Sequence, residues 1–338
     1  MATARQLVAL LNSLNQGDKE QFYAIALQVA AAEAKRGRKT VAEELRVLVE
    51  QGRSQLTLQP VGLRSSDVVV PITKPRGELQ NLLTSSYPQT RLLDLVLPQN
   101  IRSRLDGVVE QQRRREQLRH HGLIPAATML LVGPPGSGKT LTASALSGEL
   151  HLPLYGVRLD SVITRYMGET ASKLRLIFDQ IGSSRGVYLF DEFDAIGGKR
   201  TADNDIGEMR RVLNSFLQFL EETRSSDSLV LCATNHPELL DRALFRRFNE
   251  VLEYDLPDEE MARELLHSRL KNLGFRSDYW SDLREAALGL SHAELVGAAD
   301  DTMKQIIMGQ GDSADISLIR GNLQRRSAMR ESLQKFEE

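Results

Sequence analysis

The sequence has a single cysteine, Cys232, among its 338 residues. One cysteine excludes a disulfide framework and a cysteine-rich metal cluster, and it is typical of a reducing compartment, so we expect a cytoplasmic protein. Because Cys232 lies in a predicted buried strand, we interpret it as a small core residue and not as a reactive thiol.

The sequence also lacks an apolar run of the roughly 18 residues that a membrane helix needs, so no membrane partner is expected. Lys and Arg number 43 against 45 Asp and Glu, a net charge of −2 that leaves no general basic excess for nucleic acid. Aromatic residues make up only 5%, which favours helical or α/β structure over a β-sandwich. At roughly 100 to 200 residues per domain, the length predicts two or three domains.

The chain divides into four stretches of different character. Residues 1–52 show apolar residues at helical spacing and predict a small three-helix N-terminal domain. Residues 53–90 lose this period, contain several prolines, and are interpreted as a linker. Apolar runs then alternate with helical stretches over 91–256, which predicts an α/β nucleotide-binding domain, and 257–338 is expected to be a helical lid with an extra C-terminal helix.

Five apolar runs in the α/β stretch are candidate strands. Short apolar runs between long helical segments are typical of a parallel sheet flanked by helices. The clearest runs are Met129–Val132, Val187–Phe190 and Leu229–Ala233, and the weaker ones are Leu154–Leu159 and Val251–Tyr254.

A phosphate-binding motif follows the first of these strands. Residues 133–140 read Gly-Pro-Pro-Gly-Ser-Gly-Lys-Thr and fit the pattern G-x-x-x-x-G-K-[ST]. Backbone N–H groups of such a loop surround a phosphate, Lys139 reaches the β and γ oxygens, and the Thr140 hydroxyl ligates Mg²⁺. A glycine-rich turn without a ligand is the alternative, disfavoured because strand, Lys and Thr all fall in place. The predicted ATP-contacting residues are Pro135, Gly136, Ser137, Gly138, Lys139, Thr140 and Leu141.

An acidic pair, Asp191 and Glu192, follows the strand Val187–Phe190. At the end of a strand beside a phosphate loop, one carboxylate can ligate Mg²⁺ and the next can polarise a water molecule. We therefore predict Asp191 as the metal ligand, together with Thr140, and Glu192 as the catalytic base. Taken alone, such a pair is more often a solvated turn.

These motifs together resemble the AAA+ ATPases, and within them the AAA clade of katanin-like and proteasomal remodellers. The resemblance covers about residues 91 to 310. Gly122–Pro125 is similar to the family's lead-in, Asp191–Ile196 to its extended Walker B motif, and Ala233–Asn235 to its sensor 1 strand end. It implies a P-loop AAA+ module that hydrolyses ATP with Mg²⁺, in which Asn235 helps to hold the attacking water. The alternative for Asn235 is a simple turn residue.

The segment Leu240–Phe248 resembles the family's second region of homology. Its two arginines reach the nucleotide of the neighbouring subunit, which implies a ring of identical chains, most often a hexamer. Relatives keep Pro-Gly between the arginines, whereas Arg246 and Arg247 are adjacent here, which leaves open which of them touches phosphate. Two solvated basic residues are the alternative.

The segment Arg165–Glu169 is similar to the loop that lines the central pore of AAA hexamers. An exposed aromatic residue, Tyr166, followed by the flexible Met167 can grip an extended polypeptide of any sequence. The alternative is that Tyr166 packs within its own domain.

A third part of the resemblance concerns the base of the nucleotide. Gly289–Leu295 is similar to the clade's helix start beside adenine and ribose, which assigns His292 and Ala293 to the nucleotide site. His292 stands where relatives commonly have Gly, so it either crowds the nucleotide or is an exposed cap residue. The usual adenine loop is replaced by Leu95–Leu97, of which Val96 is the expected contact.

The sequence therefore predicts an ATP-driven protein remodeller or unfoldase that acts on a polypeptide or partner protein. The alternatives are an ATP-gated assembly switch or scaffold and, less favoured, a nucleic-acid motor. The arginines of Gln111–His121 are accompanied by acidic residues and are interpreted as a solvated helix face. A weaker resemblance, carried by Gln21–Leu27 and Glu43–Arg46, is to small bacterial AAA ATPases found beside a subtilisin-like protease in antiviral (phage) defence pairs.

Overall fold

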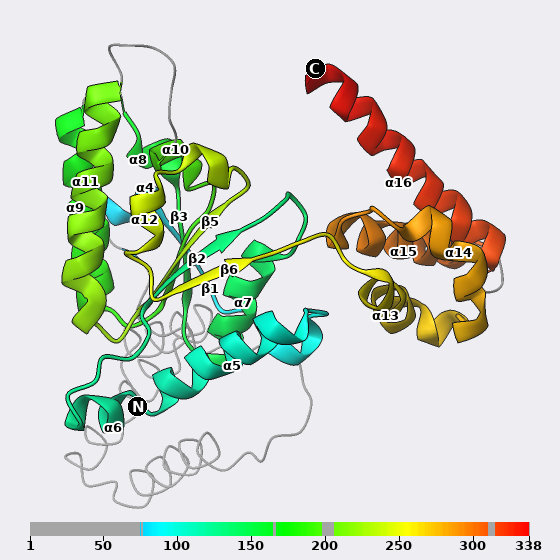
Figure 1. The fold of residues 1–338 in the computed structure, drawn as a ribbon, viewed down its shortest axis with the longest axis horizontal. Coiled ribbons are helices and arrows are strands. Elements are labelled where there is room, and N and C mark those ends of the chain that lie inside the picture. Colours follow the sequence, from blue (N-terminus) through cyan, green and yellow to red (C-terminus); the bar gives the residue numbers. More distant parts are fainter. Residues whose placement is uncertain (1–74, 76, 165–166, 198–205, 310–314, 338) are drawn as a thin grey trace, which may run out of the picture. The chain divides into compact units, whose positions relative to one another are not determined.

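The structure is a computed structural model that describes residues 75, 77–164, 167–197, 206–309 and 315–337 (Figure 1). The chain divides into two units, residues 1–70 and 71–338, and every described residue belongs to the second. The predicted N-terminal domain, residues 1–52, and most of the predicted linker therefore lie outside the described residues.

A six-stranded sheet organises the α/β part, in the order β1-β3-β4-β5-β2-β6. All neighbouring pairs are parallel except β1 and β3, which are antiparallel. The predicted α/β fold with a mainly parallel sheet is confirmed. The strands are β1 (Leu83–Ser86), β2 (Thr128–Val132), β3 (Leu154–Val157), β4 (Val187–Phe190), β5 (Leu229–Thr234) and β6 (Glu250–Glu253).

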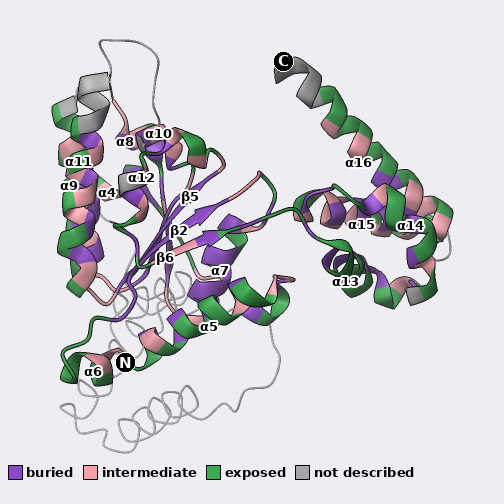
Figure 2. Ribbon diagram, in the orientation of Figure 1, coloured by how far each residue is buried: buried purple, intermediate pink, exposed green. Residues whose placement is uncertain are grey.

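The central strands are continuous apolar runs because helices cover both faces of the sheet. Every residue of β2, β4 and β5 is buried (Figure 2). Side chains alternate along β2: Met129 and Leu131 join an apolar cluster with α5 (Gln99–Arg113) and α7 (Lys139–Leu150). Leu130 and Val132 join the cluster with α9 (Met167–Ser183) and α11 (Ile206–Glu222) on the other face. Shorter helices are α4 (Leu79–Leu82), α6 (Arg115–His120), α8 (Leu159–Val162), α10 (Asp194–Gly197) and α12 (Arg242–Phe245).

The segment that we interpreted as the end of the linker differs from the prediction. Within residues 53–90, α4 and β1 are formed, and β1 pairs with β3 at the edge of the sheet. Leu82 and Leu83 are buried at 2% and 3% exposure and anchor the segment in the core. The remaining strand residues, Thr84–Ser86, are polar and exposed, so no alternation marks this edge strand in the sequence.

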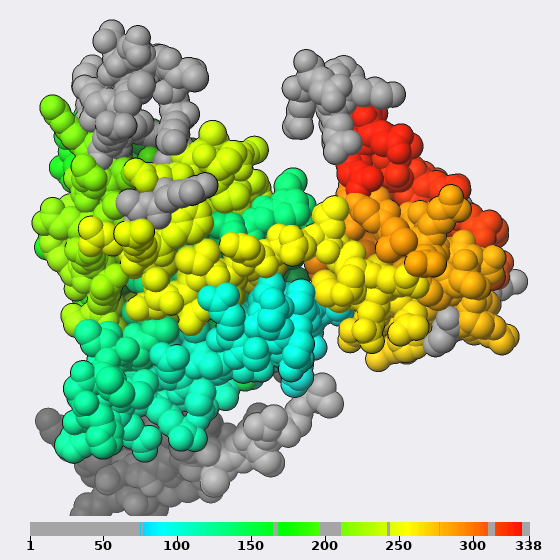
Figure 3. Space-filling model, viewed as in Figure 1, coloured from blue at the N-terminus to red at the C-terminus, as the bar shows by residue number. Residues whose placement is uncertain are grey.

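Four longer helices follow the sheet: α13 (Glu259–Leu270), α14 (Trp280–Ala287), α15 (His292–Ile307) and α16 (Ile316–Glu337). They share an apolar cluster of their own, which includes Trp280, Leu295 and Leu323. In the space-filling view their side chains form one filled body (Figure 3). The helices predicted after residue 257 are thus present, whereas the domain boundary itself stays a prediction. Among the described residues, no helix combines the length and apolarity that a membrane span requires.

Candidate active site

The loop between β2 and α7 is shaped by glycines with positive φ. Gly133, Gly136 and Gly138 have φ of 148°, 74° and 99°. A Cβ on Gly133 would lie 2.2 Å from the Tyr254 carbonyl oxygen, and one on Gly136 would lie 2.8 Å from Ser291 Oγ. Only glycine fits these close approaches without displacing backbone or the neighbouring hydroxyl. The loop therefore curls tightly in front of the first turn of α7, where free N–H groups favour an anion.

Lys139, the first residue of α7, is enclosed by this loop. It is only 6% exposed, and its ammonium donates to the carbonyl oxygens of Gly133 and Pro134, each at 2.8 Å. A further contact joins Nζ to Ser137 Oγ at 3.3 Å. Burial lowers the pKa of Lys139, and the nearby Asp191 carboxylate opposes that shift. The cation is thus held inside the loop with a carboxylate facing it.

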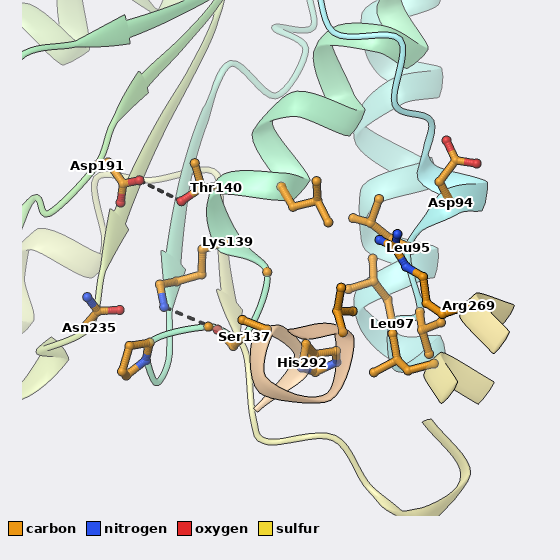
Figure 4. A pocket seen from close by; sticks show the side chains of 18 of the residues that line it. Asp94, Leu95, Leu97, Ser137, Lys139, Thr140, Asp191, Asn235, Arg269 and His292 are labelled. Atoms are coloured by element: carbon orange, nitrogen blue, oxygen red, sulfur yellow. Dashed lines mark hydrogen bonds between the residues drawn. The ribbon is translucent and has the colours of Figure 1, made fainter. Parts of the chain in front are cut away.

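Thr140 and Asp191 meet across the carboxyl edge of the sheet. Thr140 Oγ1 donates to Asp191 Oδ2 at 2.7 Å, although the residues are 51 positions apart (Figure 4). A hydroxyl and a carboxylate are ligands that Mg²⁺ accepts, and Mg²⁺ usually takes few protein ligands and keeps waters and phosphate oxygens. In the described ranges, no group of three or more His, Cys, Asp or Glu could hold a metal by itself. The donor set fits Mg²⁺ bound together with a nucleotide.

Glu192 has an unusual backbone conformation for a residue with a side chain. Its φ is +52°, a left-handed value that costs about 1–3 kcal/mol at a non-glycine residue. The neighbours impose it: Glu192 N donates to Asp191 Oδ1 at 3.0 Å, and the fully buried Phe193 donates its N–H to the Ala233 carbonyl at 2.8 Å. The turn leaves the Glu192 carboxylate at the wall of the cavity described below.

Asn235 follows the last residue of β5 and lines the same cavity. The preceding Thr234 is fixed in place because its Oγ1 donates to Asp194 Oδ1 at 2.7 Å and accepts from His236 N at 3.0 Å. The ends of β4 and β5, which are neighbours in the sheet, thereby bring Asp191, Glu192 and Asn235 to one edge.

These residues line a cavity of about 480 Å³. Figure 4 shows Lys139, Thr140, Asp191 and Asn235 on one side and Leu97, Arg269 and His292 on the other. The first side is charged and polar, and the other combines apolar side chains such as Leu97 with Arg269 and His292, which suits a ligand with a phosphate end and a flat base. All the predicted ATP and metal residues line it: Val96, Pro135, Gly136, Ser137, Gly138, Lys139, Thr140, Leu141, Asp191, His292 and Ala293.

Sequence reasoning missed several residues of the side of the cavity that lies opposite the charged groups. Leu265, Ser268 and Arg269 of α13 and Val296 of α15 line the cavity. No sequence motif marks these residues, because their position in the cavity depends on how the C-terminal helices pack against the phosphate loop. Asp94, next to the predicted Leu95–Leu97, lines the cavity as well.

The C-terminal helices contact the phosphate loop directly at the start of α15. Ala293 N donates to the Gly136 carbonyl at 3.0 Å. The helix start is fixed by a capping box in which Ser291 N donates to Glu294 Oε2 at 2.6 Å and Glu294 N donates to Ser291 Oγ at 3.3 Å. Residue 292 is therefore held at the wall of the cavity.

His292 is half-buried, and both its ring nitrogens are buried without a hydrogen-bond partner among the described residues. Burial lowers the pKa of His292, and the Asp258 carboxylate opposes the shift. Of the two alternatives for this residue, the structure favours contact with the cavity over an exposed cap. A buried imidazole without partners costs about 1–3 kcal/mol, a cost that a polar ligand would remove.

The two candidate trans-acting arginines are both exposed and lie outside the cavity of their own chain. Arg247 forms an ion pair with Glu221 of α11, and its carbonyl accepts from the Arg224 guanidinium at 2.9 Å. Arg246 has no ion pair within the part of the chain that the structure describes. The structure thus separates two residues that the sequence left equivalent.

Other predictions have mixed outcomes. Tyr166 lies outside the described residues, and Met167 is described only as the first residue of α9, so the pore loop stays a prediction. Arg113 and Arg119 of the basic segment, which we predicted to be a solvated helix face, instead pair with Glu149 at 2.8 Å and Asp227 at 2.7 Å. Cys232 is buried in β5, as predicted, and burial raises its pKa.

Comparisons with known proteins agree with this geometry. The family described as "ATPase family associated with various cellular activities (AAA)" matches residues 129–256. A protein of Sinorhizobium fredii, named uncharacterized AAA family ATPase y4kL, is 35% identical over 310 residues, 91% of this chain and 90% of the relative. FtsH of Helicobacter pylori, named an ATP-dependent zinc metalloprotease, is 30% identical over 251 residues. That match covers 71% of this chain but only 39% of FtsH.

Solved structures support the fold. The crystal structure of the FIGL-1 AAA domain matches with a TM-score of 0.58 at 21% identity, over 72% of this chain and 85% of that one. A second structure of this domain, in complex with ADP, matches with a TM-score of 0.57 at 20% identity, over 74% of this chain and 91% of that one.

We expect His292 to make the protein less stable in mild acid. Because its folded pKa lies below the unfolded value, the unfolded chain binds more protons once the pH falls below about 6.5, and stability is lost there. Melting temperatures at pH 7.5 and 5.5 should therefore fall more for the wild type than for His292→Gln. The exposed His120 provides the control, since His120→Gln should keep the wild-type dependence. Equal losses in the wild type and His292→Gln would contradict the assignment.

Proposed function

We propose that this chain, which belongs to the AAA family of ATPases, is an ATP-driven remodeller of proteins that works as a ring. As a family member it is an ATPase, which converts ATP and water to ADP and phosphate. The observation that carries the proposal is the meeting of Lys139, Thr140, Asp191 and Glu192 at one end of a cavity whose far side includes several apolar side chains.

The charged end of the cavity provides the groups for phosphoryl transfer. We place the ATP phosphates on the loop 133–140, with the Lys139 ammonium turning from loop carbonyls to the β and γ oxygens. Thr140 and Asp191 would hold Mg²⁺, which neutralises phosphate charge when bound. Glu192 then accepts a proton from the attacking water, and Asn235 orients that water. The base and ribose would occupy the side with Val96, His292 and Ala293.

Hydrolysis is proposed to depend on a neighbouring copy of the chain. No arginine of the proposed finger reaches the cavity of its own chain, and Arg246 is exposed and free of an ion pair among the described residues. Arg247 is held by Glu221, which favours Arg246 as the residue that reaches the next γ-phosphate. A ring that closes on itself places each Arg246 beside the next nucleotide, and six copies is the number that the resemblance implies.

A polypeptide is the proposed substrate. FtsH is named an ATP-dependent protease, so in that relative an AAA module accompanies proteolysis. None of the six histidines in this sequence is followed by glutamate, so the metalloprotease motif H-E-x-x-H is missing from it. If proteolysis is involved, a subtilisin-like protease of a defence pair is the partner that the weaker resemblance suggests. Tyr166 and Met167 would grip the polypeptide in the pore.

Replacing Glu192 tests the proposed chemistry. Glu192→Gln should keep nucleotide binding while phosphate release falls about 100- to 10,000-fold, since the amide accepts no proton from water. Binding of a fluorescent ATP analogue and release of phosphate measure the two effects separately. Glu264→Gln, an exposed carboxylate on α13, is the matched control and should turn over like the wild type. Turnover within twofold of wild type in Glu192→Gln would reject the base.

The two arginines are expected to differ. Arg246→Ala should lower ATPase turnover about 1,000-fold, the usual range for loss of an arginine finger. Arg247→Ala should act mainly through its exposed ion pair with Glu221, worth at most about 1 kcal/mol of stability. Mixing Arg246→Ala with Glu192→Gln should restore part of the activity, because an intact site then receives an intact arginine from its neighbour. A reversed order of the two alanine variants would overturn the choice of Arg246.

Polypeptide handling is tested at Tyr166. Casein, a loosely folded protein, should stimulate ATP hydrolysis by the wild type and by Tyr166→Phe, which keeps the aromatic ring, but not by Tyr166→Ala. Basal turnover without casein should be similar in all three proteins. If casein leaves even wild-type turnover unchanged, the alternative of an ATP-gated scaffold without threading is favoured. Loss of basal turnover in Tyr166→Ala would instead indicate that this tyrosine packs in its own domain.

A further inference from the structure

The C-terminal helix α16 packs along α15 through one face. Ile319 and Leu323 are buried, and Asn322, Arg326 and Arg330 recur on the same face at spacings of three and four residues. Asn322 is buried too, and its amide donates to Thr302 Oγ1 at 3.0 Å and to Gln305 Oε1 at 2.9 Å. The first half of α16 is thereby fixed in register against the second half of α15.

The next contacts run toward the start of α15. Arg326 pairs with Asp301 and donates to the Gly297 carbonyl at 3.4 Å. Its guanidinium lies close to Gly297, where an added Cβ would be 3.0 Å from Arg326 Cζ. One turn further, Arg330 donates to the carbonyl oxygen of Gly289.

Arg330 contacts the turn that joins α14 to α15. Gly289 lies two residues after the end of α14 and has a φ of +83°, so the carbonyl accepts the guanidinium just beyond a helix C-terminus. A cation is favoured there by the helix dipole and forms a charge-assisted hydrogen bond. The Arg330 side chain is half-buried, and its Nε has no partner among the described residues. Among the described residues, Arg330 therefore donates to the Gly289 carbonyl and forms no ion pair with an acidic side chain.

The same turn is what touches the phosphate loop. Ser291 and Ala293 follow Gly289 by two and four residues and lie against Gly136: a Cβ added there would be 2.8 Å from Ser291 Oγ, and Ala293 N donates to the Gly136 carbonyl. His292, between them, lines the cavity. A shift of the turn would displace all three residues from the loop, although Arg330 itself is not among the cavity residues.

We infer that Arg330 is a positioning residue for the nucleotide: through Gly289, the C-terminal helix holds the 289–293 turn against the phosphate loop and so sets nucleotide affinity. This inference rests on the proposed nucleotide site. It assigns to α16 a role that involves no contact with ATP, and it predicts an effect on binding without one on the chemical step.

The test compares Arg330→Gln with Arg325→Gln, an exposed arginine of the same helix. In the full chain, Arg330→Gln should raise the Kd for ADP and the KM for ATP about tenfold, the effect of losing a charge-assisted hydrogen bond. The kcat at saturating ATP should stay within about twofold, because Lys139, Asp191 and Glu192 are untouched. Arg330→Lys, which keeps a cation near the carbonyl, should recover part of the affinity, and Arg325→Gln should match the wild type.

The outcomes separate this inference from the proposed site. If Lys139→Ala also binds ADP normally, the nucleotide site itself is wrong. If Lys139→Ala loses ADP but Arg330→Gln has unchanged Kd and KM, or lowers only kcat, the positioning role is overturned. If Arg330→Gln loses helical circular dichroism and so does not fold, the Arg330→Lys variant decides the question. A folded Arg330→Lys protein with faster hydrogen exchange at residues 289–293 but a wild-type Kd for ADP would overturn the link between the turn and nucleotide affinity.

Discussion

A buried ammonium inside a turn built of glycine is the constraint on which the rest of the site depends. Lys139 is almost fully enclosed and donates to carbonyl oxygens of its own loop. That arrangement stabilises the curled loop, because a desolvated cation needs nearby oxygens. The close approaches at Gly133 and Gly136 link the loop to Tyr254 and to Ser291, one after the last strand and one among the C-terminal helices.

The sheet explains why the acidic residues face this cation. The carboxyl ends of parallel strands lie at one edge of the sheet. The neighbouring strands β4 and β5 therefore place Asp191, Glu192 and Asn235 together at that edge. The strained φ of Glu192 is maintained by the burial of Phe193 and its hydrogen bond to β5. Strain of this kind is held by surrounding packing and is concentrated at functional sites. Phe193 belongs to an aromatic cluster in which it contacts Phe216 and Phe248. The packing of this cluster therefore helps to fix the position of Glu192, the proposed base.

Sequence reasoning found the charged end of the site and only part of the other end. Phosphate and Mg²⁺ chemistry needs fixed residue types at fixed spacing after strands, so Lys139, Thr140, Asp191 and Glu192 could be identified from order alone. Arg269 and Val296 reach the cavity through helix packing, which leaves no local signal. The difference between Arg246 and Arg247 depends on Glu221, 26 residues away. The edge strand β1 was missed because its exposed polar residues do not alternate with apolar ones.

The two ends of the cavity are held by different kinds of interaction, and this bears on how nucleotide state could be transmitted. The phosphate end is fixed by the sheet and a buried core. The base end depends on one backbone hydrogen bond from Ala293 to Gly136 and on a turn supported from behind by Arg330. An element with few contacts is the one whose position a ligand can shift at small cost in free energy. The hydrogen bond from Ala293 N to the Gly136 carbonyl joins the loop that encloses Lys139 to the C-terminal helices, so a change of nucleotide at the proposed site would act on those helices there.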